Sequence, residues 1–145
     1  MSKKNPDNLE LQIRAIELLD SCLNTPKKQL PNNSVFQFDI NLEHRQNVEN
    51  KHVIVVCSVS IFTEKKEELL GQVKVSCIYY VPRFDEFIVK NSSDPKFPDD
   101  FVIKLNSITI STTRGMMFSF FRGTFLHNAI LPMVDQTIFS VSSSK

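Results

Sequence analysis

Histidine, a common side chain in metal sites and in acid–base catalysis, is rare in this chain. The three histidines, His44, His52 and His127, lie in different segments, and no pair has the i, i+4 spacing of two metal ligands on a helix. No serine lies in a G-x-S-x-G elbow or in another motif that places a base beside it. The sequence therefore indicates no catalytic centre, no metal site and no cofactor, and we expect no enzyme.

The cysteines and the acidic residues give the same indication. Cys22, Cys57 and Cys77 cannot all pair within one chain, and no two stand at a C-x-x-C spacing, so a zinc site and a redox motif both lack support. We expect three reduced, mostly buried thiols, as in a cytosolic protein. Asp39 and Glu43 lie on the polar side of a predicted strand, where carboxylates are solvated charges more often than an acid–base pair.

The composition argues against several classes of protein. The 17 basic and 16 acidic residues leave a net charge of +1, which argues against a nucleic-acid binder that depends on counterion release. No apolar run approaches the roughly 18 residues of a membrane span, and the polar N-terminus has no secretory signal. With 3 glycines, the chain is poor in the loops that cradle phosphates. We expect a cytoplasmic protein with a single domain over residues 1–145.

Strict alternation of apolar and polar residues predicts an antiparallel sheet. Residues 53–62 and 69–81 alternate on either side of a charged turn and predict a hairpin, with strands at about 51–63 and 68–82. A strand at about 35–44 has the same period of two, so we expect a meander of three strands. Four apolar side chains of this strand are expected to face inward: Phe36, Phe38, Ile40 and Leu42.

The first segment, at about 9–24, is ambiguous by pattern alone. Leu9, Leu11 and Ile13 alternate with polar residues as in a strand. Residues 15–19, in contrast, have the propensity and crowding of a helix. The pattern leaves both alternatives open.

An irregular connection and one long helix follow the sheet. Prolines and a polar cluster mark residues 83–100 as a surface connection, and Asp99 or Asp100 is expected to cap a helix over 101–122. This helix is apolar on every side, so one face must pack on the sheet and the other on a second subunit or another layer. Small residues and a methionine form the expected oligomer interface along it: Ser107, Ser111, Thr112, Gly115, Met116 and Ser119.

An apolar stretch interrupted by a proline occupies residues 123–139. Gly123 is expected to end the helix, after which the chain runs extended to Pro132. One interpretation is an ordinary loop that covers the core. The other is one wall of an apolar groove, in which Phe and Met side chains make adaptable contacts with varied partners.

Several segments, taken in order, resemble the SecB family of export chaperones. They are similar to three features of that family: its long helix, its R-G-T/G-F turn and the loop that follows the turn. The segments are Asn106-Ser107-Ile108, Arg122-Gly123-Thr124-Phe125, Leu131-Pro132 and Ile138-Phe139. The resemblance covers about residues 11–139 and implies a strand at 9–24. It implies an α+β fold, in which a four-stranded antiparallel sheet carries one long helix and a second helix is short or absent. It also implies a dimer of dimers.

The same resemblance does not decide whether this protein binds the SecA motor. Asp20 is similar to one acidic residue through which the family contacts SecA, whereas Asn24 stands where a second acid is expected. Residues 110–115 also lack the proline and the glutamate that usually open the family's long helix. A solitary SecB-like chaperone that guards an antitoxin is therefore a variant of the same hypothesis.

The function implied by the resemblance is that of a holdase, which binds unfolded polypeptides in an apolar groove without ATP. The expected client-binding residues are Phe125, Leu126, Ile130, Leu131, Met133, Ile138, Phe139, Phe36, Phe38, Ile40 and Leu42. The expected partners are unfolded polypeptides and further copies of the chain, with no nucleic acid and no insertion into a membrane. The alternative is a structural or adaptor oligomer that binds one folded partner through the same surface.

Overall fold

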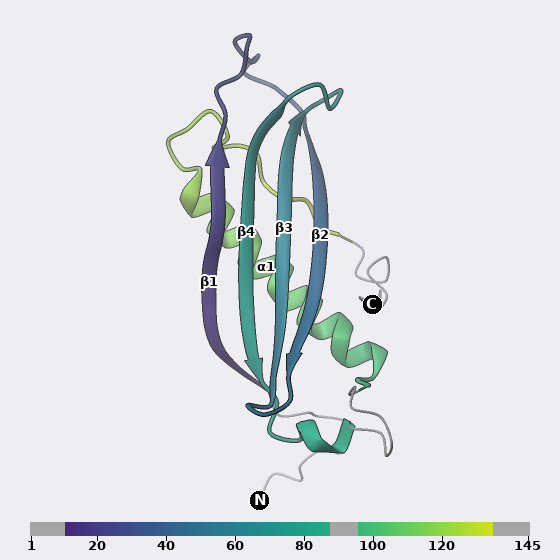
Figure 1. The fold of residues 1–145 in the computed structure, drawn as a ribbon. Coiled ribbons are helices and arrows are strands. Elements are labelled where there is room, and N and C mark those ends of the chain that lie inside the picture. The colour runs from purple at the N-terminus through teal and green to yellow at the C-terminus, as the bar shows by residue number, and fades with distance from the viewer. Residues whose placement is uncertain (1–10, 88–95, 135–145) are drawn as a thin grey trace, which may run out of the picture.

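The computed structural model describes residues 11–87 and 96–134 of the chain. Four antiparallel strands form one sheet in the order β1-β4-β3-β2, which leaves β1 and β2 at its edges (Figure 1). The strands are β1 (Gln12–Leu23), β2 (Phe36–Asn47), β3 (His52–Thr63) and β4 (Leu69–Tyr80). The first segment is therefore a strand, as the family resemblance implies and the sequence pattern alone leaves open.

One long helix packs on one face of this sheet. Helix α1 (Asp99–Phe120) contacts β3 and β4 and crosses the sheet diagonally, from the side of β2 to the side of β1 (Figure 1). A short 3-10 helix, η1 (Phe84–Phe87), precedes it. The predicted fold class, a four-stranded antiparallel sheet with one long helix packed on it, is confirmed. Residues 96–134 contain no second α-helix, and residues 135–145 lie outside the described part of the chain.

The start of α1 differs from the prediction. Pro98 occupies the N-cap position and no side chain caps the helix, so neither Asp99 nor Asp100 is the cap. Both carboxylates lie in the first turn instead, where the positive end of the helix dipole stabilises a negative charge. Phe97 packs against Phe101 with ring centroids 5.3 Å apart, so an aromatic contact holds the chain at this end of the helix.

The core lies between α1 and the face of β3 and β4 that meets it. The odd-numbered residues of both strands are buried there, as the alternation of the sequence predicts: Val53, Val55, Cys57, Val59, Ile61, Val73, Val75, Cys77 and Tyr79. Leu105, Ile110 and Met117 of α1 are buried in the same cluster. The two central strands and one side of the helix therefore supply most of the core.

Polar side chains are buried in this layer as well. The Tyr79 hydroxyl lies 2.7 Å from Thr109 Oγ1, and Thr109 Oγ1 donates to the carbonyl oxygen of Leu105 at 2.8 Å. The Tyr79 hydroxyl also lies 3.3 Å from the Leu105 carbonyl oxygen, so the two hydroxyls share this one acceptor and either can be the donor in the bond between them. His44 Nε2 of β2 lies 2.6 Å from Oδ1 of the buried Asn106 on α1. Hydrogen bonds between helix and sheet thus pair polar groups that would be costly to bury alone.

The edge strands carry apolar side chains that α1 does not cover. On β1, Ile13, Ile16 and Leu18 pair with core residues of β4 and so share the helix side of the sheet, yet they are 48, 47 and 44% exposed. On β2, the residues predicted to face inward are half-buried and pack against the core: Phe36, Phe38, Ile40 and Leu42. The helix side of the sheet is therefore buried at its centre and partly open along both edges.

Removal of the buried Tyr79 hydroxyl tests the polar contact between helix and sheet. We expect Tyr79→Phe to lower the free energy of unfolding by about 1–2 kcal/mol, because the buried hydrogen bonds of the Tyr79 hydroxyl to Thr109 and Leu105 are lost. Urea unfolding followed by circular dichroism measures the change. Tyr80→Phe is the matched control, since Tyr80 points to the opposite face and its hydroxyl bonds to none of the described residues; its effect stays within about 0.5 kcal/mol. Equal losses in the two variants would contradict the assignment.

Candidate functional site

The segment after α1, here called the strap (residues 121–134), turns back on the side of the sheet that the helix occupies and runs toward β2 (Figure 1). Gly123 makes this turn with φ of +80°, a conformation that favours glycine. Thr124 Oγ1 donates to the Phe121 carbonyl at 2.7 Å and accepts from the Leu126 amide at 3.1 Å. The residues of the R-G-T-F turn therefore reverse the chain just beyond the end of the helix.

The predicted client-binding residues of the strap divide into two groups. Leu126 and Leu131 are 1 and 2% exposed and belong to the core. Phe125, Ile130 and Met133 are 38, 57 and 90% exposed. The division does not follow a simple alternation along the strap, since Leu131 and Met133 are two residues apart and are 2 and 90% exposed. The remaining two predicted residues, at 138 and 139, lie outside the described part of the chain.

Gly71 of β4 leaves the space in which the buried side of the strap packs. A Cβ atom on Gly71 would lie 2.7 Å from Leu126 Cδ1 and 3.2 Å from Phe121 Cζ. The same atom would lie 3.3 Å from the Cys22 carbonyl oxygen of β1. A side chain at this position would therefore force the ends of the Leu126 and Phe121 side chains to shift, which explains why one of the few glycines stands in a central strand.

Arg114 of α1 holds the other end of the strap. Its Nε donates to the carbonyl oxygen of Leu131 at 2.7 Å, and its Nη2 donates to that of Pro132 at 2.9 Å. Both acceptors belong to the backbone, so the contact does not depend on the side chains of the strap. The strap is thus anchored to β4 through Leu126 and to α1 through Arg114.

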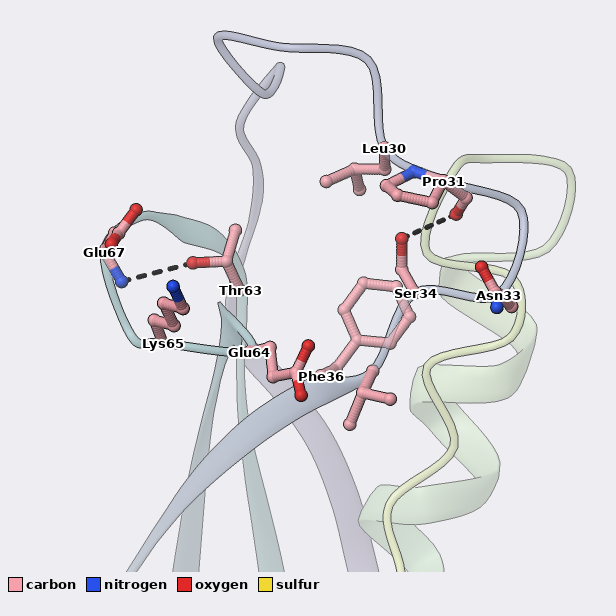
Figure 2. Close-up of a pocket in the computed structure, with 10 residues that line it drawn as sticks. Leu30, Pro31, Asn33, Ser34, Phe36, Thr63, Glu64, Lys65 and Glu67 are labelled. Atoms are coloured by element: carbon pink, nitrogen blue, oxygen red, sulfur yellow. Dashed lines mark hydrogen bonds between the residues drawn. The ribbon is translucent and has the colours of Figure 1, made fainter.

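A hollow of about 460 Å³ lies at the Phe36 end of the half-buried row on β2. Figure 2 shows Leu30, Pro31 and Phe36 on one side of it and residues of the β3–β4 turn on the other. That turn contributes Glu64, Lys65 and Glu67. Sequence reasoning missed this site, although its signal is visible: Leu30 and the 55% exposed Val35 are apolar residues in an otherwise polar connection.

The outward face of α1 carries the predicted oligomer interface. Ser111, Gly115 and Ser119 are exposed, and Thr112 and Met116 are half-buried. A shallow hollow of about 430 Å³ lies over Ser107, Ile108, Ser111 and Thr112. The interface stays a prediction, but these residues form one accessible strip along the helix.

The groups with acid–base or metal-binding chemistry lie apart. His44 bonds to Asn106, whereas the His52 ring lies 6.3 Å from that of Tyr80 and the His127 ring 5.9 Å from that of Phe118. The described residues contain no group of three side chains that could hold a metal ion. Two of the predicted solvated carboxylates form exposed ion pairs, Asp39 with Lys66 at 2.7 Å and Glu43 with Arg45 at 3.3 Å.

Two of the thiols are buried between sheet and helix. Burial raises the pKa of Cys57 to about 11, and burial likewise raises the pKa of Cys77. Both thiols therefore stay protonated near neutral pH and lack the thiolate that a nucleophile requires. Cys22, on the edge strand β1, is half-buried.

None of the helices within residues 11–87 and 96–134 is long and apolar enough to cross a membrane.

Asp20, the predicted motor contact, lies on β1 opposite Lys74, on the face of the sheet away from α1. Its role stays a prediction.

No family model and no curated protein matches the chain. Solved structures, in contrast, match its arrangement of sheet, helix and strap. A SecB-like chaperone of Mycobacterium tuberculosis, in complex with a ChAD peptide from the HigA1 antitoxin, matches with a TM-score of 0.54 and 10% sequence identity. The match covers 86% of this chain and 85% of that chain. The chain has the SecB-like fold. A protein of unknown function from Streptococcus agalactiae matches with a TM-score of 0.44 and 10% identity, over 88% of this chain and 98% of that one. The SecB-like fold confirms the resemblance that the helix, turn and strap carry in the sequence.

Thiol labelling tests the burial of the cysteines. At pH 8 we expect a disulfide reagent to modify Cys22 quickly, and Cys57 and Cys77 only on unfolding, because burial both shields them and raises their pKa values. In Cys22→Ser the fast phase should disappear. A fast phase of more than one thiol per chain in the native protein would contradict the burial of Cys57 and Cys77.

The raised pKa of Cys57 also predicts a dependence of stability on pH. The folded protein keeps the thiol neutral up to about pH 11, whereas the unfolded chain ionises it near pH 9.0. The free energy of unfolding should therefore fall as the pH rises from 9.0 towards 11. Urea unfolding of the wild type and of Cys57→Ala across this range measures the effect, and an equal pH slope in both proteins would contradict it.

Proposed function

We propose that this chain is an ATP-independent chaperone that binds unfolded or extended polypeptides. The observation that carries the proposal is an ordered strap that presents Phe125, Ile130 and Met133 to solvent, on a chain with the SecB-like fold. A matched structure with that fold holds a peptide from an antitoxin. An exposed apolar surface held in a defined shape is what the capture of unfolded chains requires.

The proposed polypeptide site combines the exposed side chains of the strap with the half-buried row of β2. Phe36, Phe38, Ile40 and Leu42 pack against the core but keep part of their surface open. Leu126 and Leu131 take a different role in this proposal, since they support the strap from the core side. Residues 138 and 139 remain predicted members of the site.

Many small apolar contacts suit such a site better than one deep pocket. Each 100 Å² of apolar surface that a client buries contributes about 2.5 kcal/mol at roughly 25 cal/mol per Å². Ordering of an unfolded segment costs part of this gain, so affinity depends on how many contacts one client makes. Thioether and aromatic side chains adapt to clients of different sequence, because they tolerate varied packing.

Substitution of two exposed strap residues tests the proposal. In Ile130→Ser combined with Met133→Ser, we expect at least a tenfold loss of affinity for a reduced, unfolded model polypeptide, because about 1.4 kcal/mol of apolar contact corresponds to that factor. Fluorescence anisotropy of the labelled polypeptide measures the affinity. Since both side chains face solvent, the unfolding midpoint should stay near that of the wild type.

The control removes an apolar side chain of similar exposure far from the strap. Val48 lies at the β2–β3 turn and is 42% exposed, so Val48→Ser should leave the affinity unchanged. Equal binding by the double variant and the control would remove the strap from the site. If the wild-type protein ignores unfolded chains and instead retains one folded partner, the adaptor alternative replaces the proposed function.

We propose further that the chain associates with copies of itself through the outward face of α1. The exposed small residues of this helix allow a close approach, and the open apolar row of β1 supplies more surface on the same side of the sheet. A Cβ atom on Gly115 would meet no atom within 4 Å, so a larger residue fits the isolated protomer there.

Gly115→Arg separates self-association from folding. In light scattering on a size-exclusion column, we expect the wild type to elute as an oligomer and Gly115→Arg with the mass of one chain, 16.7 kDa. Asn41→Arg adds the same charge on the exposed opposite face of the sheet and should leave the oligomer intact. A wild-type protein with the mass of one chain would contradict the interface.

A further inference from the structure

The guanidinium of Arg114 donates its hydrogen bonds to the backbone of the strap. Within residues 11–87 and 96–134 it forms no ion pair with a carboxylate. Its Nε and Nη2 donate instead to two consecutive carbonyl oxygens, those of Leu131 and Pro132, at 2.7 and 2.9 Å. Charged donors form stronger hydrogen bonds to carbonyl oxygens than neutral donors do.

The geometry of the two acceptors explains why an arginine stands there. The planar guanidinium presents Nε and one Nη as a fork on one edge, which fits two neighbouring acceptors at once. Pro132 has no N–H, so this part of the strap cannot form a complete ladder with a β-strand. Arg114 therefore supplies the hydrogen bonds that the carbonyl oxygens of Leu131 and Pro132 would otherwise accept from a neighbouring strand.

The contact of Arg114 lies beside the outward-facing side chains of the strap. With the carbonyls of Leu131 and Pro132 held against α1, the Leu131 side chain is 2% exposed and that of Met133 is 90% exposed. The other anchor, Leu126 at Gly71, lies nearer the start of the strap, and the Leu131 side chain packs in the core. We propose that Arg114 is the positioning residue of the polypeptide site, which holds Ile130 and Met133 in the orientation that clients bind. This inference rests on the proposed function.

Two variants of Arg114 and one control test it. Arg114→Leu removes both donors, and Arg114→Lys keeps the charge but lacks the fork that reaches two carbonyls at once. Arg45→Leu removes a positive charge from an exposed residue of β2, on the face of the sheet away from α1, and is the matched control. Arg114→Lys also serves as the test protein should Arg114→Leu fail to fold.

The first measurement is hydrogen exchange of the Ala129 and Ile130 amides, which bond to the carbonyls of Leu126 and Asn128 in the strap. We expect faster exchange in both Arg114 variants and wild-type exchange in Arg45→Leu. The second measurement is the affinity for the labelled unfolded polypeptide. We expect about a tenfold loss in Arg114→Leu, a smaller loss in Arg114→Lys, and none in Arg45→Leu.

The outcomes separate the two proposals. Faster exchange with unchanged affinity would overturn the inference, because the strap would then move without consequence for the client. Lower affinity with wild-type exchange would also overturn it, since Arg114 would act by another route. If the wild-type protein binds no unfolded chain, the proposed function fails together with the binding half of the inference, while the exchange measurement still decides whether Arg114 holds the strap.

Discussion

The width of the sheet relative to its single helix determines the rest of this structure. A helix of 22 residues is about 33 Å long but only about 10 Å in diameter. Strands lie about 4.8 Å apart, so such a helix covers about two of the four. Helix α1 packs on β3 and β4, and the apolar side chains of β1 and β2 on the same face are left partly open. The rows of β1 and β2 that the proposals assign to partners are open because of this incomplete cover.

The polar contacts under α1 keep the helix in one place on the sheet. An interface made only of valine and isoleucine would tolerate sliding, because apolar contacts have little directional preference. The bonds of Tyr79 to Thr109 and of His44 to Asn106 join β4 and β2 to two successive turns of the helix. The strength of both hydrogen bonds depends on their angle as well as on their length. The position of α1 then determines where the strap begins and which part of β2 it reaches.

The fold was predictable because its signals are local. The alternation in β3 and β4 specifies which face is buried, since a period of two assigns every side chain to one side. The first strand was not predictable from the pattern, because two register shifts against β4, between Ile13 and Ala15 and between Leu18 and Asp20, break the alternation. Only the ordered resemblance to a known family decided that segment.

The candidate site was predictable as a segment but not residue by residue. Leu126, Ile130 and Leu131 are equally apolar, and nothing in their order separates the core residues from the exposed one. That distinction arises from contacts with distant residues: the missing side chain of Gly71 admits Leu126, and Arg114 bonds to the backbone at Leu131. A solvent-exposed apolar strap would ordinarily collapse onto the nearest apolar surface. Here both anchors act through the backbone or through buried side chains, so the exposed side chains of Phe125, Ile130 and Met133 are not needed for the fold.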